Sequence, residues 1–112
     1  MKVTIDQALS RLPAAPTDTY PGGAPFVRMM AGGSMSVEVF TPQGVDLQQP
    51  HSQDELYFIH SGTAQIIIND QRFDAAPGDA FFVAAGVAHK FENFSSNFVT
   101  WVVFYGPQGG EQ

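Results

Sequence analysis

The stretch QQPHSQDELYFIHSG, residues 48–62, decides the class of fold because a polar turn passes directly into a short apolar run. The run from Glu55 to His60 is rich in aromatic and aliphatic residues, and Ser61-Gly62 ends it with a turn. A second short apolar run, AQIII at residues 64–68, follows at once. Two short strands joined by a tight turn are typical of an antiparallel β-protein.

Short strands separated by turn residues continue along most of the chain. The period-two pattern predicts strands at residues 26–32, 34–40, 55–60, 64–68, 80–84, 88–94 and 97–106, with a tight hairpin at Asn69-Asp70. About eight to ten such strands, with no central helix, favour a β-sandwich or barrel. The same pattern excludes a parallel nucleotide-binding sheet.

The N-terminal segment differs from the rest of the chain. Thr4 and Gln7 form the pattern of a capping box, and Pro13 closes the segment, so we expect one short helix over residues 5–12. Residues 13–25 are rich in Pro and Gly. They form either an ordered arm or a flexible linker, and both readings stay open at this point.

The composition fits a single small domain. The chain has 112 residues, of which 44% are hydrophobic, and this is enough for one core. We divide residues 1–112 into an N-terminal helix and arm (1–25), a barrel (26–106) and a polar tail (107–112). The net charge is −6, and the five Lys and Arg residues are scattered. We therefore expect no nucleic-acid partner. Without a long apolar run, a signal segment or any cysteine, we expect no membrane partner and a cytoplasmic protein.

Several polar residues at the start of the quoted stretch could form a metal site. Gln49 and His51 stand two positions apart, so on a strand they face the same side, about 7 Å apart. Glu55 would lie about 13 Å from His51 on one straight strand. A turn at residues 52–54 instead brings Glu55 back opposite His51. His89 supplies a third ligand, and two histidines with one carboxylate are sufficient to hold a divalent transition metal.

Other polar residues near this site are assigned by strand alternation. If Glu55 faces inward, Tyr57 and Ile59 do the same and His60 faces outward. We therefore interpret His60 as a surface residue. Glu38 faces solvent or, if Phe40 marks the inward side of its strand, enters the pocket, and we favour the surface. No catalytic residue can be named from the sequence, although Tyr57 and Glu38 are candidates for a separate general base.

Two motifs in this chain resemble those of the small single-domain bacterial cupins. The first consists of Gln49-Pro50-His51, three residues, Glu55, six residues and Gly62, with Gly44 one residue closer than the family pattern asks. The second consists of Gly78, Ala84-Ala85-Gly86, His89 and Asn93, with Ala84 in place of proline. Gln49 replaces the first histidine of the cupin pattern. The resemblance covers roughly residues 35–105.

The resemblance implies an all-β fold, a double-stranded β-helix or jelly-roll barrel, here with a short N-terminal helix. It implies one divalent metal (Fe, Mn, Ni, Zn or Cu) bound by His51, Glu55 and His89, with Gln49 as a possible fourth ligand. It also implies a homodimer and a small-molecule ligand or substrate.

The resemblance leaves the function open between three readings. We favour a metal-dependent enzyme with dioxygenase-, isomerase- or lyase-type chemistry on a small organic molecule. The alternative is a non-catalytic module that binds a metal or a small molecule. A third reading, motivated by Gln49 and Ala84, is a structural barrel with a vestigial site.

Overall fold

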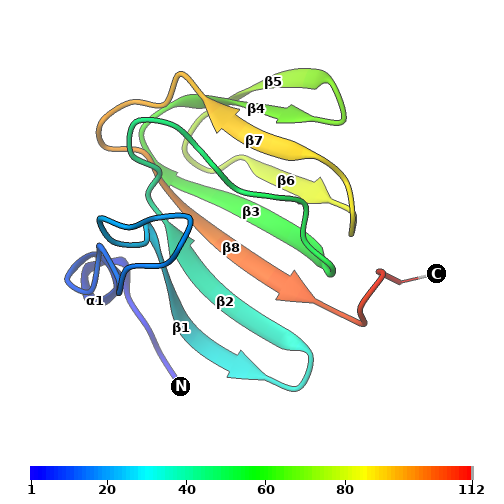
Figure 1. Cartoon of the computed structure of the whole chain (residues 1–112), viewed down its shortest axis with the longest axis horizontal. Helices are drawn as coiled ribbons and strands as arrows, with labels where there is room; N and C mark the ends of the chain where they lie inside the picture. Colours follow the sequence, from blue (N-terminus) through cyan, green and yellow to red (C-terminus); the bar gives the residue numbers. More distant parts are fainter. Residues whose placement is uncertain (112) are drawn as a thin grey trace.

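Two antiparallel sheets face each other in the computed structural model, which describes residues 1–111 (Figure 1). The elements in chain order are α1 (Ile5–Leu9), β1 (Phe26–Gly32), β2 (Met35–Phe40), β3 (Asp54–Ser61), β4 (Ala64–Ile68), β5 (Gln71–Ala75), β6 (Ala80–Val83), β7 (His89–Glu92) and β8 (Val99–Tyr105). The larger sheet has the order β1-β2-β8-β3-β6, and the smaller has the order β5-β4-β7. This all-β jelly-roll arrangement confirms the expected fold class.

The strand pattern of the sequence is reproduced closely. β1, β4 and the hairpin between β4 and β5 lie where the period-two pattern places them. Asn69 and Asp70 both have positive φ, 48° and 69°, and Ile68 pairs with Gln71 across the turn. Positive φ at both central residues is the geometry of a type I′ hairpin, which short polar residues tolerate.

The core lies between the two sheets. Tyr57 and Val102 face inward from the larger sheet, Ile66 and Phe91 face inward from the smaller one, and all four are buried. Inward-facing residues of two packed sheets interdigitate, and each such fully buried side chain contributes about 1.5–3 kcal/mol to stability. This shared core fixes the distance between the sheets, and therefore the position of any group that projects between them.

The helix is shorter than the expected residues 5–12. The capping box is present, since Gln7 N–H donates to Thr4 Oγ1 (3.1 Å) and Thr4 N–H donates to Gln7 Oε1 (2.8 Å). Ser10 ends the helix because its hydroxyl donates to the carbonyl of Gln7 (2.7 Å) and thus occupies a helical acceptor. Ala8 then packs on the outer face of the larger sheet against Val39.

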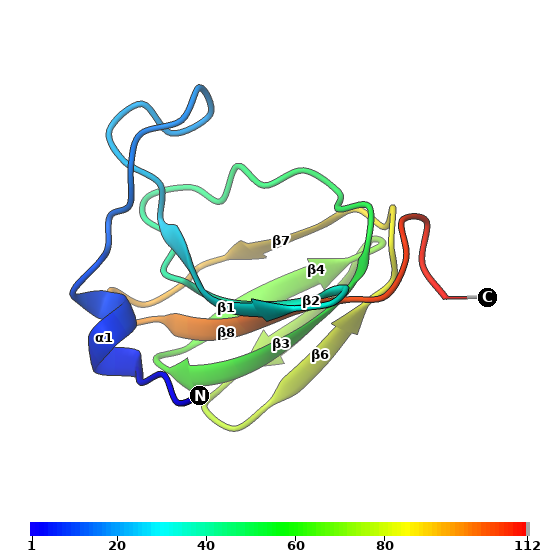
Figure 2. The ribbon, with the colours of Figure 1, turned by 90° about the horizontal axis from the view of Figure 1, so that it is seen from below.

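The Pro/Gly-rich segment forms an ordered arm. Ala14 and Ala24 pair as an isolated antiparallel bridge, with backbone N···O distances of 2.8 and 3.1 Å. The bridge closes a loop that extends away from the sheets beside β1 (Figure 2). Within residues 1–111, no helix has the length and apolarity that crossing a bilayer requires.

Candidate metal site

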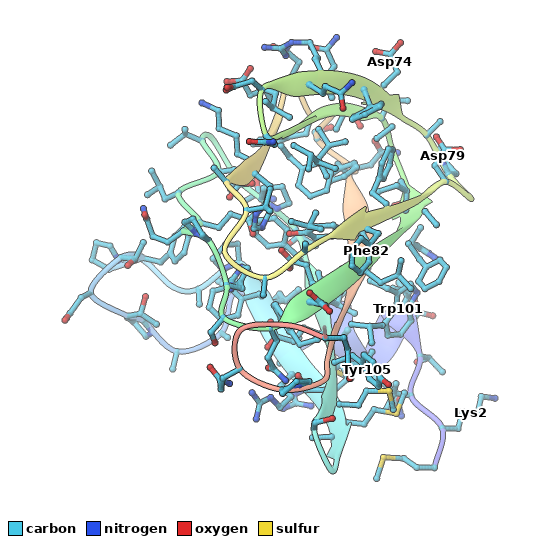
Figure 3. All side chains as sticks on the ribbon, turned by 90° about the vertical axis from the view of Figure 1, so that its right-hand side faces the viewer. Lys2, Asp74, Asp79, Phe82, Trp101 and Tyr105 are labelled. Carbon is cyan, nitrogen blue, oxygen red and sulfur yellow. The ribbon has the colours of Figure 1, made fainter. Side chains whose placement is uncertain are left out.

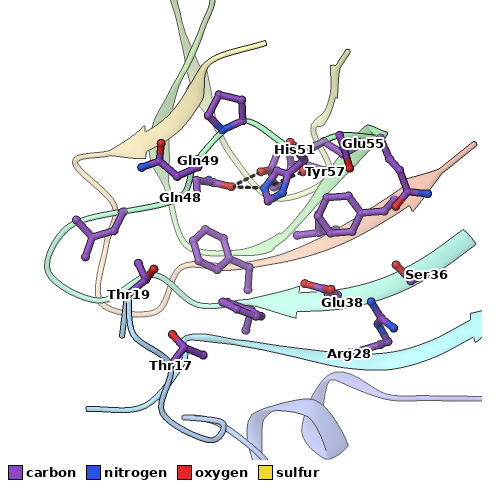
Figure 4. A pocket seen from close by; sticks show the side chains of 18 of the residues that line it. Thr17, Thr19, Arg28, Ser36, Glu38, Gln48, Gln49, His51, Glu55 and Tyr57 are labelled. Carbon is purple, nitrogen blue, oxygen red and sulfur yellow. Dashed lines mark hydrogen bonds and ion pairs between the residues drawn. The ribbon is translucent and has the colours of Figure 1, made fainter. Parts of the chain in front are cut away.

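Three residues from separate segments meet between the sheets. His51 lies in the loop between β2 and β3, Glu55 lies on β3, and His89 opens β7. One ligand atom from each lies within 4.8 Å of the other two. Nε2 of His89 is 2.6 Å from Oε1 of Glu55. Nε2 of His51 is 3.9 Å from Oε2 of the same carboxylate, and both of these residues are labelled in Figure 4. The structure therefore brings together the three residues that the sequence analysis selected.

Backbone contacts explain why these side chains converge. Glu55 pairs with Val83 and Phe104 on its two neighbouring strands, so its side chain direction is fixed by both. The carbonyl of His51 accepts a hydrogen bond from the N–H of Gly86 (2.8 Å), in the turn before β7. That bond holds the loop carrying His51 against the turn that leads to His89.

Gln48, and not Gln49, has its amide within this cluster. Oε1 of Gln48 lies 3.3 Å from Nε2 of His51 and 3.1 Å from Nε2 of His89. It also accepts a hydrogen bond from the hydroxyl of Tyr57 (3.0 Å). Gln49 is exposed and lines the neighbouring cavity, and within residues 1–111 its side chain forms no hydrogen bond. The loop is not a regular strand, so the two-residue spacing of Gln49 and His51 does not put them side by side.

Asp46 fixes the orientation of Gln48. Its carboxylate accepts hydrogen bonds from the backbone N–H of Gln48 (3.1 Å) and from Nε2 of the Gln48 side chain (2.6 Å). The same carboxylate accepts the N–H of Phe91 on β7 (2.8 Å) and is buried. Because the amide nitrogen is engaged by Asp46, the amide oxygen points at the two imidazoles. The sequence analysis selected neither residue, and no local pattern distinguishes Asp46 from an ordinary loop acid.

The atoms that face one another are nearly all hydrogen-bond acceptors. Nδ1 of His89 is 2.9 Å from the carbonyl of Val87, so in the neutral ring Nδ1–H donates there and Nε2 carries a lone pair. That lone pair faces oxygens of Glu55 and Gln48. Both carboxylate oxygens of Glu55 are buried and have no hydrogen-bond partner within residues 1–111. Converging lone pairs around a buried carboxylate repel one another unless a cation lies among them, and this donor set fits a divalent metal.

The surroundings shift the pKa values of the two histidines in opposite directions. Burial lowers the pKa of His51, and the charge of Glu55 only partly offsets it. Burial alone also lowers the pKa of His89, but the close contact with Glu55 and its charge outweigh burial and raise it. The raised pKa of His89 favours a protonated ring, whose Nε2 lies 2.6 Å from the Glu55 carboxylate. A bound metal would replace that proton.

A cavity of about 540 Å³ adjoins the cluster and is lined by the arm, by β1, β2, β3 and β8, and by the loop between β2 and β3. Phe40 and Phe104 form an apolar part of the cavity wall. Glu38 and Arg28 are charged residues of the lining (Figure 4). Glu38 is half-buried, so the surface position expected for it is wrong. The reason is that α1 covers the outer face of the sheet behind Val39, which leaves Glu38 on the face toward the cavity.

The other two residues considered for chemistry are placed as follows. His60 is exposed, as expected. Tyr57 is buried, and burial together with the negative charge of Glu55 places its pKa well above the ordinary value. Tyr57 is therefore a hydrogen-bond donor at neutral pH and not a base.

Comparison with known proteins agrees with this geometry. Residues 36–105 match the cupin domain family, and the chain belongs to that family. It is 36% identical over 85 residues to an uncharacterized protein of Streptomyces coelicolor, covering 74% of this chain and 81% of the relative.

Solved structures share the fold at low sequence identity. A cupin superfamily protein of Desulfitobacterium hafniense superposes with a TM-score of 0.62 and 21% identity, covering 73% of this chain and 76% of that one. The DMSP lyase DddQ of Ruegeria pomeroyi superposes with a TM-score of 0.63 and 23% identity, covering 72% of this chain and 46% of the lyase.

Proposed function

We propose that this cupin binds one divalent transition metal through His51, Glu55 and His89 and acts on a small organic molecule in the adjoining cavity. The observation that carries the proposal is the buried carboxylate of Glu55, which lacks a hydrogen bond within residues 1–111 and faces two imidazole nitrogens. A set of two nitrogens and one carboxylate suits Fe, Mn, Ni, Zn or Cu. Gln48 is the better placed of the two glutamines for a fourth, neutral oxygen.

Each residue near the metal has a separate task in this proposal. A bound divalent metal polarises a substrate oxygen or, if it is redox-active, exchanges electrons with the substrate. Tyr57 and Asp46 keep the amide oxygen of Gln48 turned toward the site. Phe104 packs edge-on against the ring of His51, with ring centroids 4.8 Å apart, and limits the access of water to it. Dioxygenase-, isomerase- and lyase-type reactions are all compatible with these tasks.

A non-catalytic binding module is the second candidate. It is favoured by the small number of groups that could move a proton in the cavity. Tyr57 is held in its protonated form, which leaves Glu38 as the candidate acid or base outside the metal ligands. If the protein is a binding module, it holds metal and ligand without turning the ligand over.

Metal analysis tests both candidates. The purified full chain is stripped with chelator, reconstituted separately with Fe(II), Mn(II), Ni(II), Zn(II) and Cu(II), and its metal content is measured. We expect about one ion per chain for at least one metal. Oxygen uptake and product analysis with small diols and keto acids then separate enzyme from binding module. A chain that retains no metal under any of these conditions contradicts both candidates.

We also propose that the protein forms a homodimer through the outer face of the larger sheet. An apolar surface lies there beyond the area covered by α1, and we call it the open patch: Met35, Leu56, Phe58, Phe82, Val103 and Tyr105. Phe82 is 62% exposed and Tyr105 53% exposed, and a shallow cavity of about 200 Å³ lies between them (Figure 3). A two-fold axis places the same patch on both copies, so each would cover the other.

A further inference from the structure

Arg28 places a positively charged guanidinium at the cavity beside the metal site. Among the lining residues in the described part of the chain, it is the sole Lys or Arg. Its guanidinium forms no hydrogen bond or ion pair with any residue from 1 to 111. Arg72, by contrast, donates to Glu92 (2.9 Å) and to Gln65 (2.8 Å) on the molecular surface. Arg28 is itself exposed at the cavity, so the five donors on its fixed planar group stay available there.

The strand register places Arg28 at one end of a cross-strand row, and Tyr57, at the other end, lies next to the metal site. Arg28 pairs with Glu38, Glu38 pairs with Val102, and Val102 pairs with Tyr57. Direct cross-strand partners project from the same face of a sheet, so this row of side chains faces the cavity together. Three strand spacings separate the ends of the row, or about 14 Å between backbones. Figure 4 shows Arg28 and Glu38 on the neighbouring strands β1 and β2, at the side of the cavity away from His51 and Glu55.

We infer that Arg28 is an anion-binding residue and that the molecule bound in this cavity is a small organic acid, with its carboxylate on the Arg28 guanidinium and its other end at the metal site. The assignment of the other end rests on the proposed function. A guanidinium matches the two oxygens of a carboxylate with two parallel hydrogen bonds. The cavity of about 540 Å³ that both ends of the row adjoin has room for a small organic acid.

A competing explanation is that Arg28 only balances the charge of its strand neighbour Glu38. Burial raises the pKa of Glu38, while Arg28 lowers it. The two side chains nevertheless form no ion pair in the described structure, although they are direct cross-strand partners. The two explanations predict different ligand affinities for the double variant that lacks the charges of both Arg28 and Glu38. If Arg28 serves Glu38 alone, removal of both charges restores ligand binding, whereas an anion-binding Arg28 is needed whatever residue 38 is.

The test uses lactate, malonate and succinate as probes, with lactamide, malonamide and succinamide as uncharged matches. Each is titrated into the full chain, in metal-loaded and chelator-stripped form, while the Arg28 side-chain N–H is followed by NMR. We expect at least one acid to shift this signal and to bind at least tenfold more tightly than its amide. Arg28→Gln should weaken that acid at least tenfold, and Arg28→Lys should weaken it less. Glu38→Gln should leave the affinity equal or higher.

Three outcomes overturn the inference: no acid binds more tightly than its amide, Arg28→Gln binds the acid as the wild type does, or the Arg28→Gln, Glu38→Gln double variant regains wild-type affinity. Metal content, measured on the same samples, separates this inference from the proposed function. Arg28→Gln should hold as much metal as the wild type. Acid binding that depends on Arg28 in a chain unable to hold metal would support the subsite and contradict the proposed function.

Discussion

The carboxylate of Glu55 and the imidazole of His89 lie 2.6 Å apart and belong to different sheets. Glu55 stands on β3 of the larger sheet, and His89 stands on β7 of the smaller one. Both side chains are buried, so the contact joins the two layers from inside. A metal at this point would therefore crosslink the sheets, and metal binding should be coupled to the stability of the whole fold.

Removal of a ligand should abolish this coupling. We expect His89→Ala and Glu55→Gln to lower metal affinity by at least about a hundredfold, because the first removes a donor nitrogen and the second replaces the charged carboxylate with a neutral amide. In the wild type, metal at a hundred times its Kd should raise the unfolding free energy by about 2.7 kcal/mol. Thermal unfolding with and without metal measures this difference. The exposed His60 provides the control, and His60→Ala should respond to metal as the wild type does.

The two adjacent glutamines should respond differently to substitution. Gln48→Ala removes an oxygen that faces both imidazoles, and we expect it to weaken metal binding by about ten- to a hundredfold. Gln49→Ala alters an exposed side chain and should change the affinity less than about twofold. Competition titrations with a chelator of known affinity compare the two variants directly. Equal losses in both, or a larger loss in Gln49→Ala, would show that the loop rearranges around the metal.

Metal affinity should rise with pH through the neutral range. Metal and proton compete for Nε2 of His89, whose pKa Glu55 holds above its ordinary value despite burial. Below that pKa the affinity should fall by about tenfold for each pH unit, and above it the affinity should level off. Since the ordinary value is about 6.5, the levelling lies at higher pH. Burial lowers the pKa of His51, so His51 adds a second proton only in more acidic solution. Titrations from pH 6 to 9 check this, and a flat profile would contradict it.

Gly62, the last residue of the first motif, should be required for folding and not for chemistry. It has φ +75°, and a Cβ there would lie 2.5 Å from Ser95 Oγ and 2.6 Å from Phe98 Cα. Gly62→Ala should lower the unfolding free energy by about 3 kcal/mol or more. The new Cβ would push the backbone of Phe98 away, and alanine would also be strained at this positive φ. Gly78→Ala is the matched control, since Gly78 has φ +89° with no atom near its Cβ position, and it should cost about 1 kcal/mol. Urea unfolding of both variants gives the comparison.

The open patch should determine the oligomeric state. Phe82→Glu places a charge in its centre and should convert the dimer to a monomer, because an apolar interface does not accept an unpaired charge. Phe73→Glu is the control, because Phe73 is a comparably exposed aromatic residue (40%) on the smaller sheet. Light scattering coupled to size-exclusion chromatography measures the mass of each. A wild-type monomer at working concentrations, or a dimeric Phe82→Glu variant, would contradict the proposed interface.

The sequence was informative where local rules decide the structure. Strand alternation and turn residues identify the strands, and the polar pair Asn69-Asp70 identifies the hairpin, because both depend on neighbours along the chain. The meeting of His51, Glu55 and His89 is different, since it depends on how two sheets stack. The spacing of both cupin motifs supplied that long-range information.

The positions of Gln48 and Glu38 depend on contacts between distant parts of the chain, and the alternation of residues along a strand does not predict such contacts. The side chain of Gln48 lies in the site because its amide N–H donates a hydrogen bond to Asp46. The carboxylate of Asp46 also accepts a hydrogen bond from the backbone of β7. A rule based on strand alternation selects Gln49 instead. Glu38 was assigned to the wrong side for a similar reason: the helix that covers the outer face of β2 comes from a distant part of the chain. A packing partner from a distant part of the chain therefore determines which face of a strand is covered and which face lines the cavity.

The loop between β2 and β3 contributes two of the four groups that converge at the site, Gln48 and His51, while Glu55 and His89 stand on strands. Two of these four groups would therefore change by substitution in one short irregular segment, with both sheets left intact. The anchor at Asp46 keeps the segment in place while the residues after it vary. Substitution within this loop is therefore the change that should alter the metal preference of the proposed site and leave the barrel as it is.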